Sequence, residues 1–250
     1  MQRKILTNKQ AAGPSRYGYT LTADAHDADA DGYLRPSSIL RYLQTAANLQ
    51  LHTYGPSNEE LREKGQAFVL TRLSLDFIKP VASYEELYAE TWGLESTGVS
   101  FGRCFCLSRQ GECVARAQSV WALLDIKNKR PLPVSVFEAG FGTDICFENA
   151  LPLRTKMPPD AEFLKVGTHH VSYAETDANH HMNNTCYPDM LVDFLKLEGR
   201  RVRSMILNFR QEAPSGSDLE VYHYETADAH YFRTLREDGQ VNIEAVLHLI

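Results

Sequence analysis

The residue types best suited to chemistry are concentrated in one polar segment, residues 177–184, with the sequence Asp-Ala-Asn-His-His-Met-Asn-Asn. A carboxylate (Asp177), an amide (Asn179) and an imidazole (His181) at alternate positions can supply a base, an orienting group and a proton carrier. The segment precedes a predicted helix, and the free N–H groups near its start, at 183–186, suit a developing negative charge. Asp and Asn are also favoured helix caps, so composition alone leaves a structural role open.

The elements that must position this segment recur in the same order in both halves of the chain. Each half has a strand-like stretch, a polar loop and an apolar run at helical spacing, then several strand-like stretches. The first helix begins at Pro36, because proline with serines beside it is a helix-start signal. The first half is predicted to contain a strand at 17–24, a second helix at 57–64, and strands at 67–79, 85–95, 100–109 and 112–126. The second half is predicted to contain a strand at 169–173, a helix at 185–197, and strands at 203–210, 219–225, 231–236 and 241–249.

The second half can be aligned on the first by a constant difference in residue number, one value for the polar loops and another for a later strand. The facing positions are Asp29 and Asp177, Asp31 and Asn179, Tyr33 and His181, and, on the later strand, Pro80 and Glu212. Residues 131–160 are rich in proline and glycine and are predicted to be a linker between domains at 1–130 and 161–250. This plan predicts an α+β fold of two tandem domains, each an antiparallel sheet wrapped around a long helix.

The polar segment, followed by Tyr187, resembles the catalytic segment of the acyl-acyl carrier protein thioesterases. Residues 209–212, Phe-Arg-Gln-Glu, are similar to the strand of that family that carries a further catalytic glutamate, and residues 68–72 resemble a strand opening in its first half. The resemblance therefore covers nearly the whole chain. It implies two tandem hot-dog domains and hydrolysis of fatty acyl-acyl carrier protein to free fatty acid and carrier protein, in fatty acid biosynthesis. The catalytic residues that it implies are Asp177, Asn179, His181 and Glu212.

The two halves are expected to differ in role. The first half has Tyr33 in place of the imidazole and Pro80 in place of the glutamate. We therefore expect one active site per chain, in the C-terminal hot-dog domain, and an acyl tunnel with a degenerate site in the N-terminal one. Apolar residues that could close the tunnel, although such residues more often form the core, are Leu40, Leu43, Phe68 and Leu70.

Two positions depart from the pattern of the family. Met190 stands where members often have tryptophan, and Ala213 stands where many plant members have a cysteine after the glutamate. A cysteine mechanism at position 213 is therefore impossible in this chain. Cys186 lies near a predicted helix start, where thiol pKa values can fall, but its apolar neighbours indicate a small packed residue.

A thioester makes modest demands on its catalyst, because the leaving thiol has an ordinary pKa near ~8.5 and departs with little acid help. Asp177 or Glu212 would polarise the attacking water, with His181 aligned by Asn179. Direct attack by Asp177 through an anhydride is the alternative. The sequence does not choose between these routes.

Composition narrows the class of protein. With 26 basic against 32 acidic residues the formal net charge is −6, which argues against a general nucleic-acid binder. No stretch approaches the ~18 apolar residues of a membrane span, and the first residues predict neither a secretory signal nor a long transit segment. Five cysteines, an odd number without a Cys-x-x-Cys pair, indicate a reduced setting. We therefore expect a cytoplasmic enzyme of bacterial type.

No cofactor and no metal are expected. Four histidines fall close together, but in adjacent pairs whose rings should point apart; these are His169, His170, His180 and His181. The expected partner is acylated acyl carrier protein, which is strongly acidic. A basic stretch at 196–210 could dock it; its cations are Lys196, Arg200, Arg201, Arg203 and Arg210, against Glu198.

Other classes of function stay open at this level. A thioesterase acting on coenzyme A esters or, less favoured, a hot-dog dehydratase would use a similar fold, and a non-catalytic acyl-binding hot-dog module would keep only the tunnel. Incubation with acylated carrier protein and with matching coenzyme A esters, followed by assay of free thiol, would separate them. Both a monomer and a homodimer are compatible with the sequence.

Overall fold

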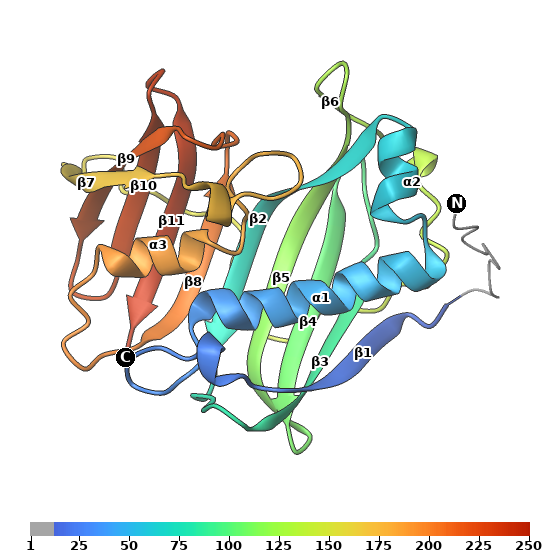
Figure 1. The fold of residues 1–250 in the computed structure, drawn as a ribbon, viewed down its shortest axis with the longest axis horizontal. Coiled ribbons are helices and arrows are strands. Elements are labelled where there is room, and N and C mark those ends of the chain that lie inside the picture. The colour runs from blue at the N-terminus through green and yellow to red at the C-terminus, as the bar shows by residue number, and fades with distance from the viewer. Residues whose placement is uncertain (1–12) are drawn as a thin grey trace.

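The structure, a computed structural model, describes residues 13–250, and its strands form one antiparallel sheet (Figure 1). The strand order is β1-β3-β4-β5-β2-β8-β11-β10-β9-β7, and the short β6 pairs with β5. The first-half strands are β1 (Arg16–Thr22), β2 (Gln66–Phe77), β3 (Glu86–Gly93), β4 (Phe101–Arg109), β5 (Glu112–Asp125) and β6 (Arg130–Pro131). The second-half strands are β7 (Leu164–His170), β8 (Val202–Phe209), β9 (Asp218–Glu225), β10 (His230–Arg236) and β11 (Val241–Leu249).

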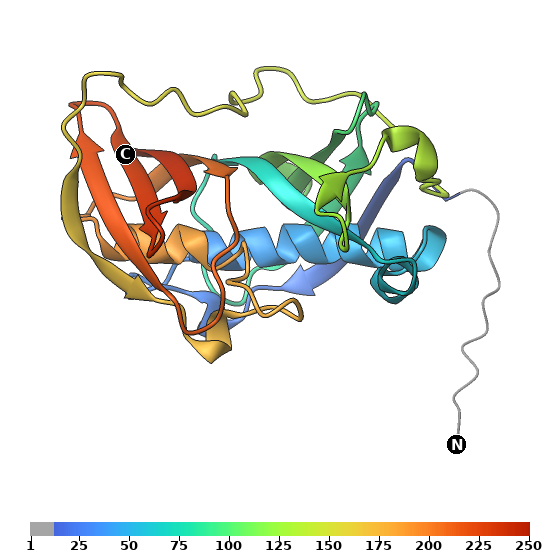
Figure 2. The same cartoon turned by 90° about the horizontal axis from the view of Figure 1, so that it is seen from above.

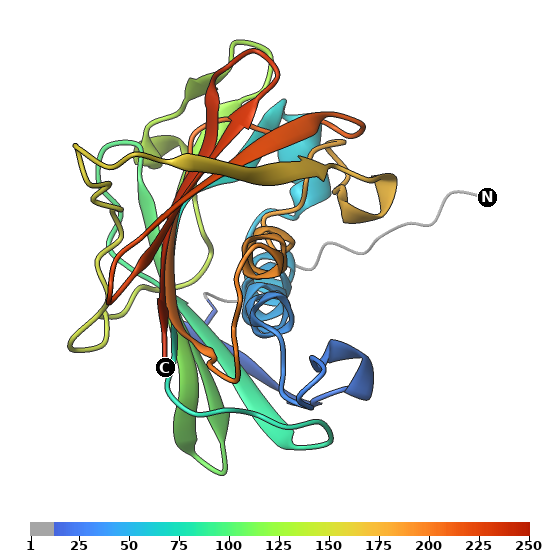
Figure 3. The ribbon, with the colours of Figure 1, turned by 90° about the vertical axis from the view of Figure 1, so that its left-hand side faces the viewer.

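The sheet curves around helices that lie on one of its faces (Figure 3). Helix α1 (Pro36–Tyr54) belongs to the first half and α3 (Tyr187–Asp193) to the second, while α2 (Asn58–Glu63) lies beyond the end of α1. The apolar faces of α1, α3 and the concave side of the sheet form a single hydrophobic core; its members include Leu40, Leu43, Leu73, Phe105, Leu191, Leu207 and Phe232. The predicted α+β plan of two tandem units is therefore confirmed.

Helix α1 follows from its sequence. Pro36 occupies the first turn, where its missing N–H costs nothing. Ile39, Leu40, Leu43 and Ala46 then fall on one face and are at most 3% exposed. The short α2 begins with a reciprocal capping box, in which the side chains of Ser57 and Glu60 each accept from the other residue's backbone N–H.

The second helix is shorter than the predicted 185–197. At its start, the N–H and hydroxyl of Thr185 donate to Oδ1 of Asn183 (3.0 and 2.8 Å), so this stretch forms a side-chain-closed turn instead of helix. At its end, the N–H groups of Phe194 and Leu195 bond to carbonyls three residues back, a tightening typical of a helix C-terminus. The polar turn chemistry prevails over the apolar spacing that suggested a longer helix.

The strand predicted at 169–173 is also displaced. β7 spans Leu164–His170 and contains a register shift against β9 between Lys165 and Gly167, which obscures its alternation in the sequence. Residues after it turn away into a short 3₁₀ segment, Tyr173–Glu175, stabilised by reciprocal bonds between Ser172 and Glu175.

The two halves share the sheet through β2 and β8, a pairing that the sequence did not predict. The strands pair from Arg72 opposite Asn208 to Asp76 opposite Ser204. The Asn208 side chain also holds the linker, since its Nδ2 donates to the Leu153 carbonyl (3.0 Å) and its Oδ1 accepts from the Thr155 N–H (3.2 Å). The linker thus crosses the face of the sheet opposite the helices (Figure 2).

The prediction about a signal or transit segment concerns residues that lie outside the described 13–250. Within the described part, no helix is both long and apolar enough to cross a membrane. All five cysteines are free thiols, but Cys104 lies against Cys146 and Cys106 against Cys113, so a reduced setting stays a prediction.

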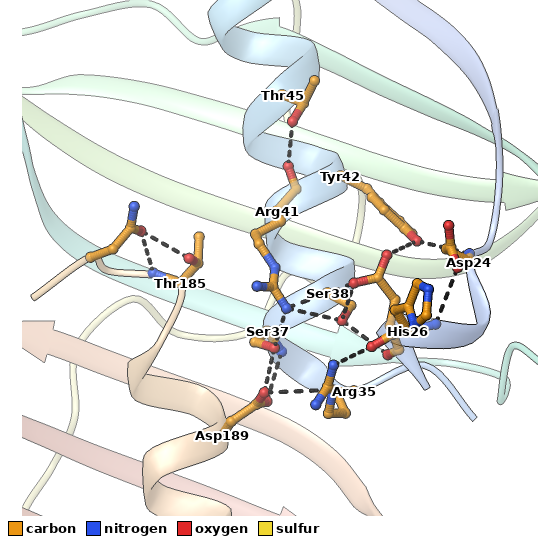
Figure 4. A network of polar contacts seen from close by, with 12 residues as sticks. Asp24, His26, Arg35, Ser37, Ser38, Arg41, Tyr42, Thr45, Thr185 and Asp189 are labelled. Carbon is orange, nitrogen blue, oxygen red and sulfur yellow. Dashed lines mark hydrogen bonds and ion pairs between the residues drawn. The ribbon is translucent and has the colours of Figure 1, made fainter. Parts of the chain in front are cut away.

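The start of α1 is capped by a residue from the other half (Figure 4). Arg35 at the N-cap position makes no side-chain cap bond. Instead, Oδ1 of Asp189 in α3 accepts from the Ser37 N–H (3.1 Å), and its Oδ2 accepts from the Ser37 hydroxyl and faces the Arg35 guanidinium at 3.9 Å. One carboxylate therefore satisfies the helix start and ties the halves together.

We expect Asp189→Ala to lower the free energy of unfolding by ~1–2 kcal/mol, because it removes a helix cap. Asp189→Asn, which keeps an acceptor oxygen, should lose less. Asp193→Ala is the matched control, since Asp193 lies one turn later in α3 and forms no hydrogen bond or ion pair among residues 13–250. Thermal and denaturant unfolding would measure all three, and equal losses in the Asp189 and Asp193 variants would contradict the capping role.

Candidate active site

Residues 176–182 form a tight loop held by the Asp177 side chain. Its Oδ1 accepts from the backbone N–H groups of Asn179 (2.7 Å) and His181 (3.4 Å), and its Oδ2 accepts from Asn179 Nδ2 (3.1 Å). The Asp177 N–H donates to the His181 carbonyl (2.9 Å), and His180 takes a positive φ of 62° at the tip. Asp177 and Asn179 are thus brought together, and the carboxylate orders the loop.

The loop of the first half is built by equivalent hydrogen bonds. Oδ1 of Asp29 accepts from the N–H groups of Asp31 and Tyr33 (both 3.0 Å), and the Asp29 N–H donates to the Tyr33 carbonyl (2.7 Å). Gly32, with φ of 82°, takes the place of His180. The internal repeat predicted from the sequence is therefore present down to individual hydrogen bonds.

The second half adds an imidazole facing a carboxylate. Nδ1 of His181 lies 3.6 Å from Oε2 of Glu212, and the two side chains are 31% and 47% exposed. Their approach is fixed by the backbone, because His181 bridges Pro214 and the Met182 N–H donates to the Ala213 carbonyl (2.8 Å). Glu212 thus occupies the place beside His181 that the sequence analysis gave to Asn179, whose amide instead bonds to Asp177.

A cavity of about 490 Å³ lies next to this loop. Its walls come mainly from α1, α2, β2, β4 and β5 of the first half, and the second half contributes Asp177, Ala178 and Asn179. Three phenylalanine rings on its wall pack edge to face, Phe68 with Phe101 at 5.2 Å and both with Phe137 at 5.0 and 5.5 Å. The arrangement suits an elongated apolar group whose reactive end meets the polar loop.

Only one of the four residues considered for the tunnel lines this cavity. Phe68 does, whereas Leu40, Leu43 and Leu70 are core residues at most 5% exposed. Sequence reasoning missed Phe137 and Phe141, because they lie in the segment predicted to be linker; aromatic residues among its prolines and glycines were the available signal.

Most backbone N–H groups proposed for the oxyanion already have partners. Those of Asn183, Thr185 and Cys186 donate to the Glu175 carbonyl, the Asn183 side chain and the Asn183 carbonyl. Within residues 13–250, the Asn184 N–H alone in this stretch has no hydrogen-bond partner. The group of amides expected at 183–186 is thus reduced to one.

The histidines near the loop do not converge on a common point. His169 Nε2 faces Glu175 at 2.9 Å, His170 Nδ1 faces Asp218 at 2.7 Å, and His181 faces Glu212. A different cluster, at the end of the β9–β10 hairpin, could hold a metal ion. Its ligand atoms lie within 4.8 Å of one another, and its residues are His223, Glu225 and His230.

The basic stretch at 196–210 is divided by the structure. Arg200 and Arg201 precede β8, whereas Arg210 follows it and pairs with Glu244 at 3.0 Å. Arg201 stacks over the Tyr33 ring at 3.9 Å, in a second cavity on the first-half loop. Arg200 and Arg201 therefore lie about one strand length, ~25 Å, from Glu212.

Solved structures of similar fold were found over nearly the whole chain. An acyl-ACP thioesterase from Bacteroides thetaiotaomicron has a TM-score of 0.79 at 20% identity, covering 94% of this chain and 98% of that one. An oleoyl thioesterase from Lactobacillus plantarum gives 0.77 at 18%, covering 94% and 96%, and a 12:0-ACP thioesterase from Umbellularia californica gives 0.78 at 14%, covering 94% and 97%. The curated proteins contain no match. These likenesses show that the fold is a double hot-dog.

Family models make the assignment specific. A model of the acyl-ACP thioesterase N-terminal domain matches residues 16–136, and one of the acyl-ACP thioesterase C-terminal domain matches residues 160–247. The chain belongs to the acyl-ACP thioesterase family, and it is a thioester hydrolase.

Cys186 is expected to be inert in this site. Burial raises the pKa of its thiol, and its Sγ lies 3.7 Å from the Glu175 carbonyl oxygen. Cys186→Ala should leave kcat nearly unchanged, against the ~100-fold loss of a catalytic group. In native alkylation followed by peptide mapping, Cys113 should react first, because its hydrogen bond from Cys106 lowers its pKa. An inactive, folded Cys186→Ala variant would restore a thiol mechanism.

Proposed function

We propose that this thioesterase releases fatty acids from acyl carrier protein with Asp177, Asn179, His181 and Glu212 as its catalytic residues. The observation that carries the assignment is the His181–Glu212 contact, made from the same loop whose residues Asp177 and Asn179 line the cavity. The matching loop of the first half has the same hydrogen bonds but Tyr33 and Pro80 at these positions. A constellation added to only one copy of a shared loop supports a chemical role for the added groups.

His181 is the general base in this mechanism. With Nδ1 turned toward Glu212, a proton on Nδ1 leaves Nε2 free to accept one from water. The water oxygen attacks the thioester carbon, the C–S bond breaks, and the proton passes from His181 to the departing sulfur. Glu212 holds the ring orientation and stabilises the transient imidazolium, and the pair shortens from 3.6 Å when substrate excludes water.

Asp177 and Asn179 position the thioester at the cavity wall. Asn179 Nδ2 uses one hydrogen on Asp177 and has a second for the thioester oxygen, to which the Asn184 N–H is the additional candidate donor. Asp177 accepts three hydrogen bonds, which reduce the nucleophilicity of its carboxylate. Water attack is therefore favoured over an anhydride intermediate.

The two domains divide the work in this proposal. The N-terminal hot-dog domain, 1–130, supplies the acyl tunnel and a degenerate site, and the C-terminal one, 161–250, supplies the catalytic residues. The linker at 131–160 contributes Phe137 and Phe141 to the tunnel wall. We place the enzyme in the cytoplasm, as a monomer or homodimer.

We expect His181→Ala and Glu212→Gln each to lower kcat by at least ~100-fold, the usual loss for a positioned acid–base group. Asp177→Asn should lower kcat by a similar factor, because it removes the carboxylate oxygen that orients the Asn179 amide toward the thioester. Asp177→Asn keeps the Oδ1 acceptor and so preserves the loop. Asp29→Asn and Asp31→Ala, at the matching positions of the first half, are the controls and should stay within about threefold, because no imidazole stands beside them. Steady-state kinetics measures kcat for all five variants. Active-site titration of the wild-type enzyme should give one site per chain. Near-normal turnover in the His181 variant would remove the assignment.

The carrier protein is acidic, so its docking needs a cationic surface near the site. The exposed turn at 127–130 carries Lys127, Lys129 and Arg130, and Lys129 Nζ lies 3.6 Å from Glu212 Oε1. This turn lies nearer the site than Arg200 and Arg201. We therefore assign the docking surface to the turn.

If so, kcat/KM for acylated carrier protein should fall as salt is added. Lys127→Glu combined with Arg130→Glu should flatten that dependence, whereas Arg200→Glu with Arg201→Glu should not. The same variants assayed on acyl coenzyme A report any general damage. If the salt dependence persists in the variant of the turn and disappears in the Arg200 and Arg201 variant, docking belongs to the surface of those two arginines.

The competing substrate is an acyl coenzyme A, and the competing class is an acyl-binding module without turnover. Release of free thiol from matched acyl-carrier and acyl-coenzyme A substrates separates all three. We expect the carrier-linked substrate to give the higher kcat/KM. If kcat/KM for the carrier-linked substrate is equal to or lower than kcat/KM for the matching coenzyme A ester, the substrate assignment is wrong.

A further inference from the structure

The cavity contains a charged group that the hydrolysis does not use. Arg103 of β4 lines it among the aromatic rings, and Nη1 donates to Gln50 Oε1 (2.7 Å) and Thr91 Oγ1 (3.0 Å). Gln50 and Thr91 are fully buried, each 0% exposed, so the guanidinium is fixed against the floor of the cavity.

Arg103 lacks the anionic partner that other arginines of the sheet have in the described part of the chain. Among residues 13–250, Arg16, Arg109 and Arg116 of the same sheet each pair with a carboxylate, but no carboxylate lies within 4.0 Å of Arg103. Burial lowers the pKa of Arg103 to about 10, which still leaves it charged at neutral pH. Its guanidinium carbon lies 5.4 Å from the centre of the Phe141 ring, a cation–π contact that compensates the charge only in part. A buried cation without an anionic partner is costly unless something pairs with it.

The free donors of Arg103 are reached from the cavity. The side chain is partly exposed although it lies deep in the protein, and Nε and Nη2 have no hydrogen-bond partner among the described residues. β4 is two strands beyond β2 in the sheet, ~10 Å further from the second half. Arg103 therefore faces the part of the cavity remote from Asp177 and Asn179, where the body of an acyl chain would lie.

A saturated hydrocarbon chain in the cavity would desolvate the Arg103 guanidinium without offering it a hydrogen-bond acceptor. An oxygen acceptor on the chain would form a charge-assisted hydrogen bond, the stronger kind. We propose that the acyl chains preferred by this enzyme carry an oxygen function, oxo, hydroxyl or carboxylate, that Arg103 binds. The inference rests on the proposed function, since it names the substrate class of the same site.

The test compares carrier-protein thioesters of equal chain length: one saturated, one with an oxo or hydroxyl group within the chain, and one ending in a carboxylate. We expect the wild-type enzyme to favour at least one oxygenated chain in kcat/KM by ~10-fold, about one charge-assisted hydrogen bond. Arg103→Met should abolish that preference and leave hydrolysis of the saturated chain equal or faster. A wild-type enzyme that takes the saturated chain as well as every oxygenated one would overturn the proposal.

Two further variants separate position from charge. Arg62→Met removes another cation from the cavity wall, on α2, and should keep the preference. Arg103→Lys keeps the charge without the planar fork and should retain part of it. If Arg103→Met fails to fold, the wild-type enzyme and Arg103→Lys decide the question. The assignment is contradicted if the wild-type enzyme shows no preference for oxygenated chains. It is also contradicted if Arg103→Lys keeps the full wild-type preference.

A binding measurement keeps this proposal distinct from the hydrolysis. Calorimetric titration of the wild-type protein with free saturated and oxygenated acids of equal length needs no turnover. Absence of hydrolysis on every thioester would remove the proposed function, and tighter binding of the oxygenated acids would still support the role of Arg103. Equal affinities would overturn it.

Discussion

The pairing of β2 with β8 is the constraint on which the rest of the molecule depends. It joins two sheets into one and thereby fixes how the halves face each other. The cavity is mostly a first-half structure, yet the loop that holds Asp177 and Asn179 at its wall belongs to the second half. Without the β2–β8 register, that loop would have no defined position over the cavity. The Asp189 cap on α1 reinforces the same arrangement on the helical face.

The repeat separates what a residue does for folding from what it does for chemistry. Asp29 and Asp177 close the same turn with the same backbone bonds, so a carboxylate is required there whether or not the site is active. In the proposed mechanism the chemistry is carried out by His181 and Glu212, which stand where the first half has Tyr33 and Pro80. A duplicated unit can thus lose its reactive groups in one copy and keep its fold.

Much of this could be predicted from the sequence, because long alternating or helical runs specify their own elements. β2 to β5 and β8 to β11 begin and end within two residues of their predictions, and α1 begins at Pro36 as expected. The motif also placed His181, Glu212 and Asp177 near one another. The predicted α3 and β7 were wrong in extent, because the Asn183 side chain closes a turn before the helix and a register shift at Gly167 interrupts the alternation of the strand. The position of Arg103 could not be predicted from the sequence, because it depends on which side chains the fold brings around it; among residues 13–250 no carboxylate pairs with it.

The order of the strands has a consequence for solubility. Two separate sheets would present four edges, each a row of unpaired N–H and C=O groups open to pairing with another molecule. Fusing them at β2 and β8 leaves two, β1 and β7. β7 carries Lys165, paired with Glu220, and a register shift beside it, both of which discourage a further strand from adding. The seam that builds the active site also removes half of the surface through which the chain could polymerise.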